Sequence, residues 1–302
     1  MTGKSDPSEN RTLQAVLDRA TQNEGPHPNP SVPKFKAPTG ACDTHCHVFG
    51  PEDKYPYVGE RFYTSPDAPM EMLFALHDRL GIDRAVIVHP SIHGTNNQAS
   101  LDAMAQRPDR YRGTAMVDLD ISDAELAALD AGGMRGIRFN FLKHLGGPPE
   151  DINAFARLIE RIARLDWHLL MHLDSIQDIE KYADLLTGLP CPVVVDHLGR
   201  VPAGEGPEGK AWQLLIGLLA NDNIWIKLSA VERVSASGHP FDDSVALAQA
   251  LLAAAPEKAI WGTDWPHPNM GADGAPDDGH LVDILPLIAP DEALRQKLLV
   301  DN

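Results

Sequence analysis

Ala41-Cys42-Asp43-Thr44-His45-Cys46-His47 is a short, largely apolar run that ends in two histidines one residue apart. Side chains alternate between the two faces of a strand, so the imidazoles of His45 and His47 share one face. We therefore expect a strand over 41–45 that brings two metal ligands together at its end. This position carries no glycine-rich phosphate loop, which argues against an open nucleotide-binding sheet.

Short apolar runs alternate with amphipathic segments of helical length from residue 41 onward. Eight runs have strand length, at 41–45, 84–88, 113–117, 136–139, 168–172, 192–196, 224–227 and 259–262. Helical spacing marks 69–80, 124–131, 151–165, 176–186, 210–220 and 242–254, with a weaker signal over 96–106. Eight parallel strands, each followed by a helix, predict an α/β protein with a (β/α)8 TIM barrel over 39–302. A doubly wound open sheet is the alternative.

Residues 1–38 differ from the rest of the chain in composition. They are polar and proline-rich, with a helical pattern over 12–23 that is followed by Gly25-Pro26-His27-Pro28-Asn29-Pro30. So many prolines cannot continue a helix or join a sheet ladder. We expect an extended arm that packs on the barrel or on another subunit, which leaves a homo-oligomer open.

The overall composition is that of an acidic globular protein. Hydrophobic residues make up 43% of the 302 residues, and the formal net charge is -17. This charge repels nucleic acid and anionic membranes, so neither is expected as a partner. The three cysteines form no Cys-x-x-Cys pair, and no secretory signal or membrane-length apolar run is evident. We expect a cytoplasmic protein.

Polar residues stand at the C-terminal ends of four expected strands. They are His45 and His47 on the first, His172 on the fifth, Asp196 and His197 on the sixth, and Thr263 and Asp264 on the eighth. Each alone is typical of a buried histidine or a helix-capping aspartate. Barrel enzymes, however, gather these strand ends on one catalytic face. Four imidazoles and a carboxylate there suit a single hard to borderline cation with an open position for water.

Five motifs resemble the amidohydrolase superfamily, in the branch that contains 2-pyrone-4,6-dicarboxylate lactonase and 4-sulfomuconolactone hydrolase. They are DTHCHVFG at 43–50, HGT at 93–95, GMRGIRFNF at 133–141, DHLGR at 196–200 and WGTDWPHP at 261–268. The match runs from about residue 39 to the end and implies lactone hydrolysis on a TIM barrel. Members of this branch continue past the position of Asn302 through a short Asn-Pro-containing tail, so we expect a longer natural chain.

The resemblance implies a role for each matching residue. Asp264 would be the general base, and His197 would hydrogen-bond the lactone carbonyl. The remaining substrate-binding candidates are Arg138, Arg233, Ser91, His93, Thr95, His144 and Arg200. The arginines suit a carboxylate or sulfonate, although the residues alone also fit a rim salt bridge for Arg138 and a pairing with Glu232 or solvent for Arg233.

Two departures from the pyrone-dicarboxylate lactonases bear on the substrate. Those enzymes have an aromatic residue at the position of His172 and a second arginine at that of His144. With His172 present, the set His45, His47, His172 and Asp264 resembles a site for one divalent cation, for which we expect Zn2+. Both departures favour a metal-dependent lactonase of muconolactone-type acids in aromatic degradation, such as 4-sulfomuconolactone.

Other functions stay open at this point. A pyrone-dicarboxylate lactonase or a metal-dependent decarboxylase would use the same barrel. A metal-free lactone isomerase would not need the His45/His47 pair, and a binding protein would show no turnover that depends on Asp264.

Overall fold

The computed structural model describes residues 25–59, 61, 63–141, 147, 149–173, 175–270 and 274–302. Eight parallel strands stand side by side in chain order. They are β1 (Cys42–Cys46), β2 (Arg84–Val88), β3 (Tyr111–Ala115), β4 (Met134–Asn140), β5 (His168–His172), β6 (Val193–Val195), β7 (Ile224–Leu228) and β8 (Ala259–Trp261). The predicted (β/α)8 barrel is confirmed, and every strand overlaps a predicted run.

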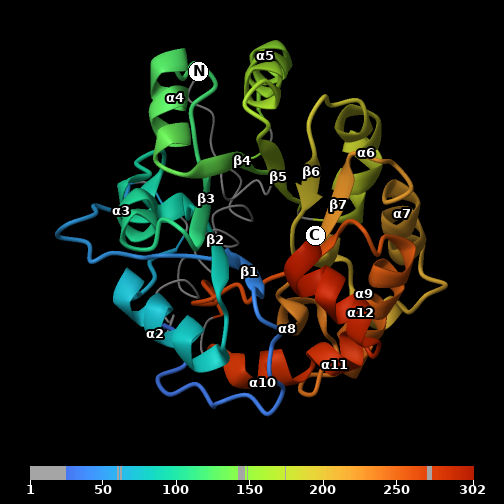
Figure 1. The fold of residues 1–302 in the computed structure, drawn as a ribbon. Helices are drawn as coiled ribbons and strands as arrows, with labels where there is room; N and C mark the ends of the chain where they lie inside the picture. Colours follow the sequence, from blue (N-terminus) through green and yellow to red (C-terminus); the bar gives the residue numbers. More distant parts are fainter. Residues whose placement is uncertain are drawn as a thin grey trace, which may run out of the picture.

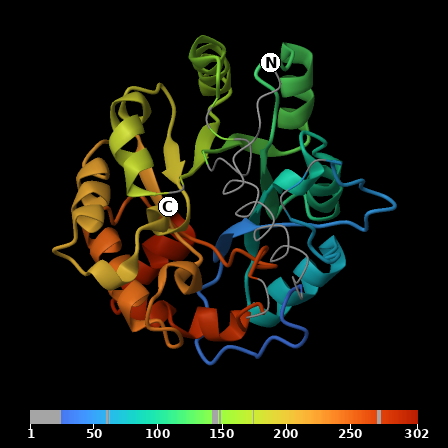
Figure 2. The same cartoon turned by 180° about the vertical axis from the view of Figure 1, so that it is seen from behind.

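Helices surround the strands on the outside of the barrel (Figures 1 and 2). Between strands lie α2 (Met70–Leu80), α3 (Gln98–Gln106), α4 (Asp123–Ala131), α5 (Ile152–Ala163), α6 (Ile176–Thr187), α7 (Lys210–Leu218) and α9 (Asp242–Ala254). Short turns are η1 (Ser91–His93), η3 (His197–Arg200), η4 (Ala203–Glu205) and α8 (Val231–Val234). After β8 come α10 (Asp278–Asp283), α11 (Leu285–Ile288), α12 (Glu292–Gln296) and the π-helical turn η6 (Lys297–Asp301). The weak helical signal over 96–106 corresponds to α3.

Helix α5 illustrates how the sequence directs these elements. Its buried side chains Phe155, Leu158, Ile159 and Ile162 follow the i, i+3, i+4, i+7 spacing of one helical face. Burying each of them stabilises the fold by about 2 kcal/mol. The Asp151 carboxylate accepts hydrogen bonds from the backbone at the start of α5 and fixes where the helix begins.

The barrel closes between its first and last strands through a short set of backbone contacts. Asp264 N donates to His45 O and His47 N donates to Trp265 O, both at 2.8 Å. Gly262 makes this approach feasible, because a Cβ atom there would lie 2.6 Å from His45 N. The seam therefore joins the two segments that carry His45, His47 and Asp264.

Strand β1 contains one extra residue relative to β2. Asp43 pairs with Ala85 and Cys46 with Ile87, so three steps along β1 match two along β2. This irregularity breaks the simple alternation of side chains. As a result Asp43 points outward, toward α2, while His45 points into the barrel.

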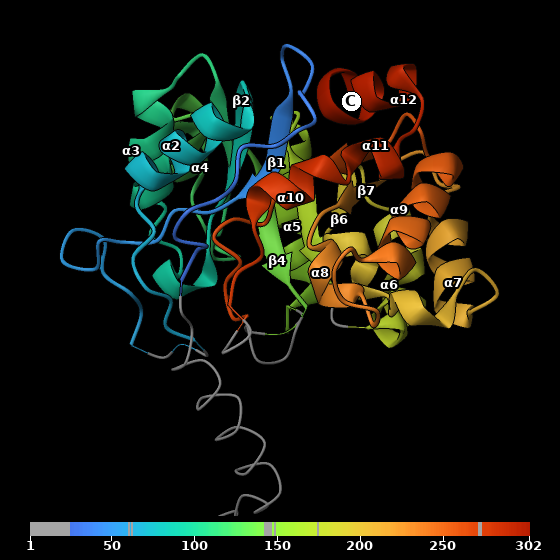
Figure 3. The same ribbon diagram turned by 90° about the horizontal axis from the view of Figure 1, so that it is seen from below.

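The segment 25–38 lies against α10, as Figure 3 shows. Asp277 accepts a hydrogen bond from Ser31 N at 2.8 Å, and Asp283 accepts from Lys34 N and Phe35 N at 2.6 and 2.9 Å. This part of the predicted arm thus packs on the barrel. The predicted helix over 12–23 lies outside the described residues. Among the described helices, none combines the length and the apolar character needed to cross a bilayer.

Candidate active site

Three imidazoles surround one oxygen of Asp264 inside the barrel mouth. Asp264 Oδ1 lies 3.5 Å from His45 Nε2, 3.4 Å from His47 Nε2 and 3.7 Å from His197 Nε2. The two Nε2 atoms of His45 and His47 are 3.2 Å apart. All four residues are at most 2% exposed. The ends of β1, β6 and β8 thus bring these four side chains together, and three of them, His45, His197 and Asp264, form a group that could hold a metal ion.

The second nitrogen of each imidazole has a partner. His45 Nδ1 lies 3.0 Å from Asp196 Oδ1, and His47 Nδ1 lies 2.6 Å from the Val88 carbonyl oxygen. A carbonyl and an ionised carboxylate only accept, so in the neutral form of each imidazole Nδ1 carries the proton and Nε2 a lone pair. His197 Nδ1 is bonded to Ser229 Oγ at 2.9 Å.

These protonation states provide a test of whether the group fits a cation. In these neutral forms the Nε2 lone pairs of His45 and His47 face each other and the ionised carboxylate of Asp264. Burial would raise the pKa of Asp264, but Arg233 and His197 hold it well below its usual range. Three electron-rich atoms this close repel one another unless a positive charge joins them. The residues therefore fit a single cation, and the described residues contain candidate metal ligands as predicted.

A buried ion pair between Lys227 and Asp196 positions His45. Lys227 Nζ lies 3.2 Å from Asp196 Oδ1 and 3.3 Å from His45 Nδ1. Burial lowers the pKa of Lys227 and lowers that of His45 to about 3. For Asp196 burial acts in the raising direction, but His45 and Lys227 hold its pKa well below the usual range. Asp196 thus stays ionised and keeps the proton of His45 on Nδ1.

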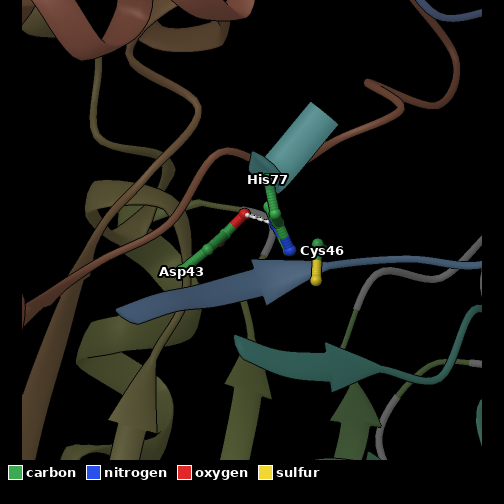
Figure 4. A group of neighbouring side chains, drawn as sticks. All are labelled: Asp43, Cys46 and His77. Carbon is green, nitrogen blue, oxygen red and sulfur yellow. Dashed lines mark hydrogen bonds and ion pairs between the residues drawn. The ribbon is translucent and has the colours of Figure 1, made fainter. Parts of the chain in front are cut away.

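Asp43 fixes the seam from the outer side of the sheet. Its carboxylate accepts from His45 N and Thr263 N, each at 3.0 Å, and from Thr263 Oγ1 at 2.6 Å. It also lies 3.1 Å from His77 Nε2 on α2, and Cys46 lies beside this pair (Figure 4). These donors occupy the Asp43 oxygens. The group of Asp43, Cys46 and His77 therefore has a structural role, which is to position β1 against β8.

The sequence predicts that His172 binds the same cation as His45, His47 and Asp264. In the structure its contacts are different. Arg138 Nη2 lies 3.2 Å from His172 Nδ1, and His172 Nε2 has no hydrogen-bond partner within the part of the chain that the structure describes. The His172 ring lies 5.1 Å from that of His197, between ring centroids. The group with ligand atoms within 4.8 Å of one another is His45, His197 and Asp264, without His172. His47 lies 3.2 Å from His45 Nε2 and 3.4 Å from Asp264 Oδ1. The contact that positions the His172 ring is the one with Arg138 on β4.

Arg233 pairs with Asp264 directly. Its Nε donates to Asp264 Oδ2 at 2.8 Å and its Nη2 to Pro268 O at 2.8 Å. Pairing with Glu232, which we considered from the sequence, is the looser contact, at 3.9 Å. Arg233 thereby directs Asp264 Oδ1 toward the histidines.

His267, which follows β8, lies behind Arg233. Its two ring nitrogens lie 3.3 Å from Glu232 Oε1 and 3.1 Å from Asp278 Oδ1. Burial would lower the pKa of His267, but Asp278 and Glu232 raise it to about 10. His267 is therefore a cation that holds α8 and α10 together.

The other predicted substrate residues have varied positions. Ser91 lies in η1 and is hydrogen-bonded to Tyr63, a buried tyrosine. His93 uses both ring nitrogens on backbone groups of the loop after β1, at Gly50 N and Pro56 O. Thr95 donates to Asp118 at 3.3 Å and lines a groove between α3 and α4.

Two further candidates complete the predicted set. Arg200 ends the turn η3 after β6 and is half-buried. His144 lies outside the described residues.

Sequence reasoning missed three residues of this region. Lys227 was detectable, since a lysine interrupts the apolar run Ile-Trp-Ile-Lys-Leu of β7. Asn140 was also detectable, because it is two residues after Arg138 and so shares its face. Tyr63 lies in an irregular loop, where no periodic pattern marks it.

A sequence model of the family described as amidohydrolase matches residues 42–302. The chain belongs to the amidohydrolase family. The resemblance seen in the motifs is thereby confirmed.

Individual relatives of this amidohydrolase cover nearly the whole chain. A 2-pyrone-4,6-dicarboxylate hydrolase from Comamonas testosteroni is 43% identical over 91% of this chain and 92% of its own length. A 4-sulfomuconolactone hydrolase from Rhizobium radiobacter is 40% identical over 92% and 93%, respectively. Among solved structures, a probable 2-pyrone-4,6-dicarboxylic acid hydrolase from Acinetobacter baumannii with citric acid bound superposes with a TM-score of 0.74. It is 28% identical and covers 86% of this chain and 96% of that one.

Proposed function

We propose that this amidohydrolase hydrolyses a lactone that bears acidic groups, with the help of one divalent cation. The observation that carries the proposal is the convergence of His45 Nε2, His47 Nε2 and Asp264 Oδ1. Arg233 contacts the other oxygen of Asp264, and Arg138 lies 3.8 Å from Asp196, the partner of His45. The first three supply metal ligands, and the arginines supply positive charge for an anionic substrate.

His45, His47 and Asp264 would hold the cation, for which we propose Zn2+, because two imidazoles and a carboxylate are a common ligand set of catalytic zinc. Such a cation, when bound, lowers the pKa of water toward neutrality and polarises a carbonyl group. Asp196 and Val88 keep the two imidazoles in the protonation state that this binding needs.

The chain's own residues account for the proton transfers. Asp264 takes a proton from the water that attacks the lactone carbonyl carbon, and the ring C–O bond then breaks as the ring oxygen receives that proton. His197, fixed by Ser229, faces the same point and donates to the carbonyl oxygen as negative charge develops there. Arg138 and Arg233 bind the acidic substituent.

The relatives support an acidic lactone as the substrate. We favour a muconolactone-type acid, such as 4-sulfomuconolactone, in aromatic-compound degradation, since His172 and His144 both depart from the pyrone-dicarboxylate pattern. The 43% identity to a 2-pyrone-4,6-dicarboxylate hydrolase favours that lactone as the second candidate.

The test is ring opening by the purified chain on three substrates: 4-sulfomuconolactone, muconolactone and 2-pyrone-4,6-dicarboxylate. We expect turnover of the sulfonated lactone, its loss after dialysis against a chelator, and its return with Zn2+. Asp264→Asn should lower kcat at least about 100-fold, because the proton acceptor is gone. Asp78→Asn, at an exposed aspartate, is the matched control and should keep full activity.

Product analysis separates the alternatives. Release of carbon dioxide from an aromatic acid would identify a decarboxylase, and an isomeric lactone would identify an isomerase. Activity of a metal-free preparation, or of Asp264→Asn, would overturn the proposed mechanism.

A further inference from the structure

The ends of β4 and β5 carry buried polar atoms that have no hydrogen-bond partner among the described residues. They are Arg138 Nε, both amide atoms of Asn140, and His172 Nε2. The three side chains are 7%, 4% and 7% exposed. Leaving a buried donor or acceptor unpaired is costly, so each such atom in a folded protein calls for an explanation.

The three residues share one side of the sheet. Arg138 and Asn140 are two apart on β4, and Asn140 is the direct neighbour of His172 in the β4–β5 ladder. Arg138 Nη2 lies 3.2 Å from His172 Nδ1. The unpaired atoms therefore belong to one patch at the mouth of the barrel, on the β4 side of the metal ligands.

The contact between Arg138 and His172 determines what His172 offers. A guanidinium can only donate, so His172 Nδ1 accepts and the ring proton is on Nε2. In this state His172 Nε2 has no lone pair for a cation and presents an N–H group. The patch thus has three N–H donors without a partner in the described ranges, on Arg138 Nε, Asn140 Nδ2 and His172 Nε2. Several donors beside a cationic guanidinium form a site for an anion.

We propose that Asn140 and His172 contact the acidic substituent of the substrate and select a sulfonate over a carboxylate. A sulfonate presents three oxygens in a pyramid, so each of the three donors, on three different side chains, can bind a separate oxygen. The two oxygens of a carboxylate lie in one plane, and one of them would have to accept two of the three hydrogen bonds. This inference rests on the proposed function for its choice of substrate, but the anion site itself does not.

The first test uses two small dianions, sulfoacetate and malonate, which differ only in one acid group. Calorimetric titration of the wild-type chain should give tighter binding of sulfoacetate. In Asn140→Leu the affinity for sulfoacetate should fall about 10-fold or more, because one hydrogen bond to a charged group is lost. The melting temperature of Asn140→Leu should not fall, because the substitution also removes a buried amide that has no partner and therefore destabilises the fold. Asn153→Leu, at an exposed position on α5, is the control and should bind both anions like the wild type.

The second test separates an N–H donor from a metal ligand at His172. His172→Gln places an amide N–H near Nε2 and should retain sulfoacetate binding, while His172→Phe should lose it. The Zn2+ content should stay at one equivalent in both. Loss of the metal from His172→Phe would overturn the assignment of His172 as a donor.

The results also distinguish this inference from the proposed function. If no lactone is hydrolysed but sulfoacetate binding depends on Asn140, the anion site stands and the reaction is wrong. If the sulfonated lactone is hydrolysed and Asn140→Leu leaves both dianion affinities and the KM unchanged, the reaction stands and this inference fails. Equal affinity for the two dianions in the wild type overturns the selectivity.

Discussion

Lys227 carries a positive charge inside the barrel, where water cannot solvate it. It lies 3.2 Å from Asp196, and both residues are at most 2% exposed. Burying such a pair is costly, but removing one partner costs more, because the other charge is left uncompensated. The pair maintains the orientation of His45, so its value lies in positioning rather than in stability.

We predict that Lys227→Met lowers the free energy of unfolding by about 3 kcal/mol, because Asp196 loses its buried counter-charge. Urea denaturation measures the change. Lys210→Met, which removes an exposed lysine paired with Glu180, is the control and should cost less than about 1 kcal/mol. Equal losses in the two variants would contradict the account of Lys227.

Strand alternation and the barrel rule place His45, His47 and Asp264 at the same barrel mouth, and their side-chain atoms do lie within 3.5 Å of one another. Positions that depend on tertiary contacts could not be predicted in this way. The position of His172 depends on a contact with Arg138, a residue on another strand, and no spacing within the sequence encodes it. Lys227 could have been predicted, because it is the one charged residue in the apolar sequence of β7.

At the level of elements, the irregularity of β1 was beyond sequence analysis. A regular strand would place Asp43 and His45 on one face, whereas the extra residue sends Asp43 to α2 and His45 into the barrel. The strand positions themselves were predicted within a few residues, because buried parallel strands are short apolar runs. The third was placed two residues late, since its start, Tyr111-Arg112, breaks the apolar pattern.

The close approach of β8 to β1 makes Gly262 sensitive to substitution. A Cβ atom there would lie 2.6 Å from His45 N, so Gly262→Ala should push the two segments apart and lower the unfolding free energy by about 1–3 kcal/mol. Lactone turnover should fall as well. Gly217→Ala is the control, because that helical glycine has nothing within 4 Å of its Cβ position and alanine favours the helix. A variant Gly262→Ala as stable and active as Gly217→Ala would contradict this reading of the seam.

The start of α9 should give the protein an acid-sensitive contribution to stability. Burial acts to raise the pKa of Asp243, but hydrogen bonds from Ser235, Ala236 and Ser237 hold it below its usual range. In the unfolded chain an aspartate has a pKa of about 4. Because the pKa of Asp243 is lower in the folded protein, its ionised carboxylate stabilises the fold at pH values above about 4. This stabilisation is lost as the pH falls below that value toward the pKa of the folded state. The gap in unfolding free energy between wild type and Asp243→Asn should therefore be wider at pH 6 than at pH 2. A constant gap across this range would disprove the link.

On the scale of the whole molecule, the segment before β1 is attached to the barrel through carboxylates near the end of the chain. Asp283 accepts the backbone N–H groups of Lys34 and Phe35. We predict that Asp283→Ala frees this segment, so that trypsin cleaves after Lys34 or Lys36 several-fold faster, as followed by mass spectrometry. Lactone turnover should not change, and Asp222→Ala, an exposed aspartate elsewhere, should not alter the cleavage rate. Unchanged cleavage in Asp283→Ala would show that other contacts hold the segment.

The seam between β1 and β8 is where the barrel closes and where the metal ligands meet. Those two strands are more than 200 residues apart in the chain, so their pairing pays one of the largest loop-closure entropies in the molecule. During refolding, the helices and their circular dichroism signal can form before β1 and β8 pair. The active site can form only after this pairing, because its residues come from both strands. Recovery of catalysis after dilution from urea should therefore lag behind circular dichroism and report the final closure step.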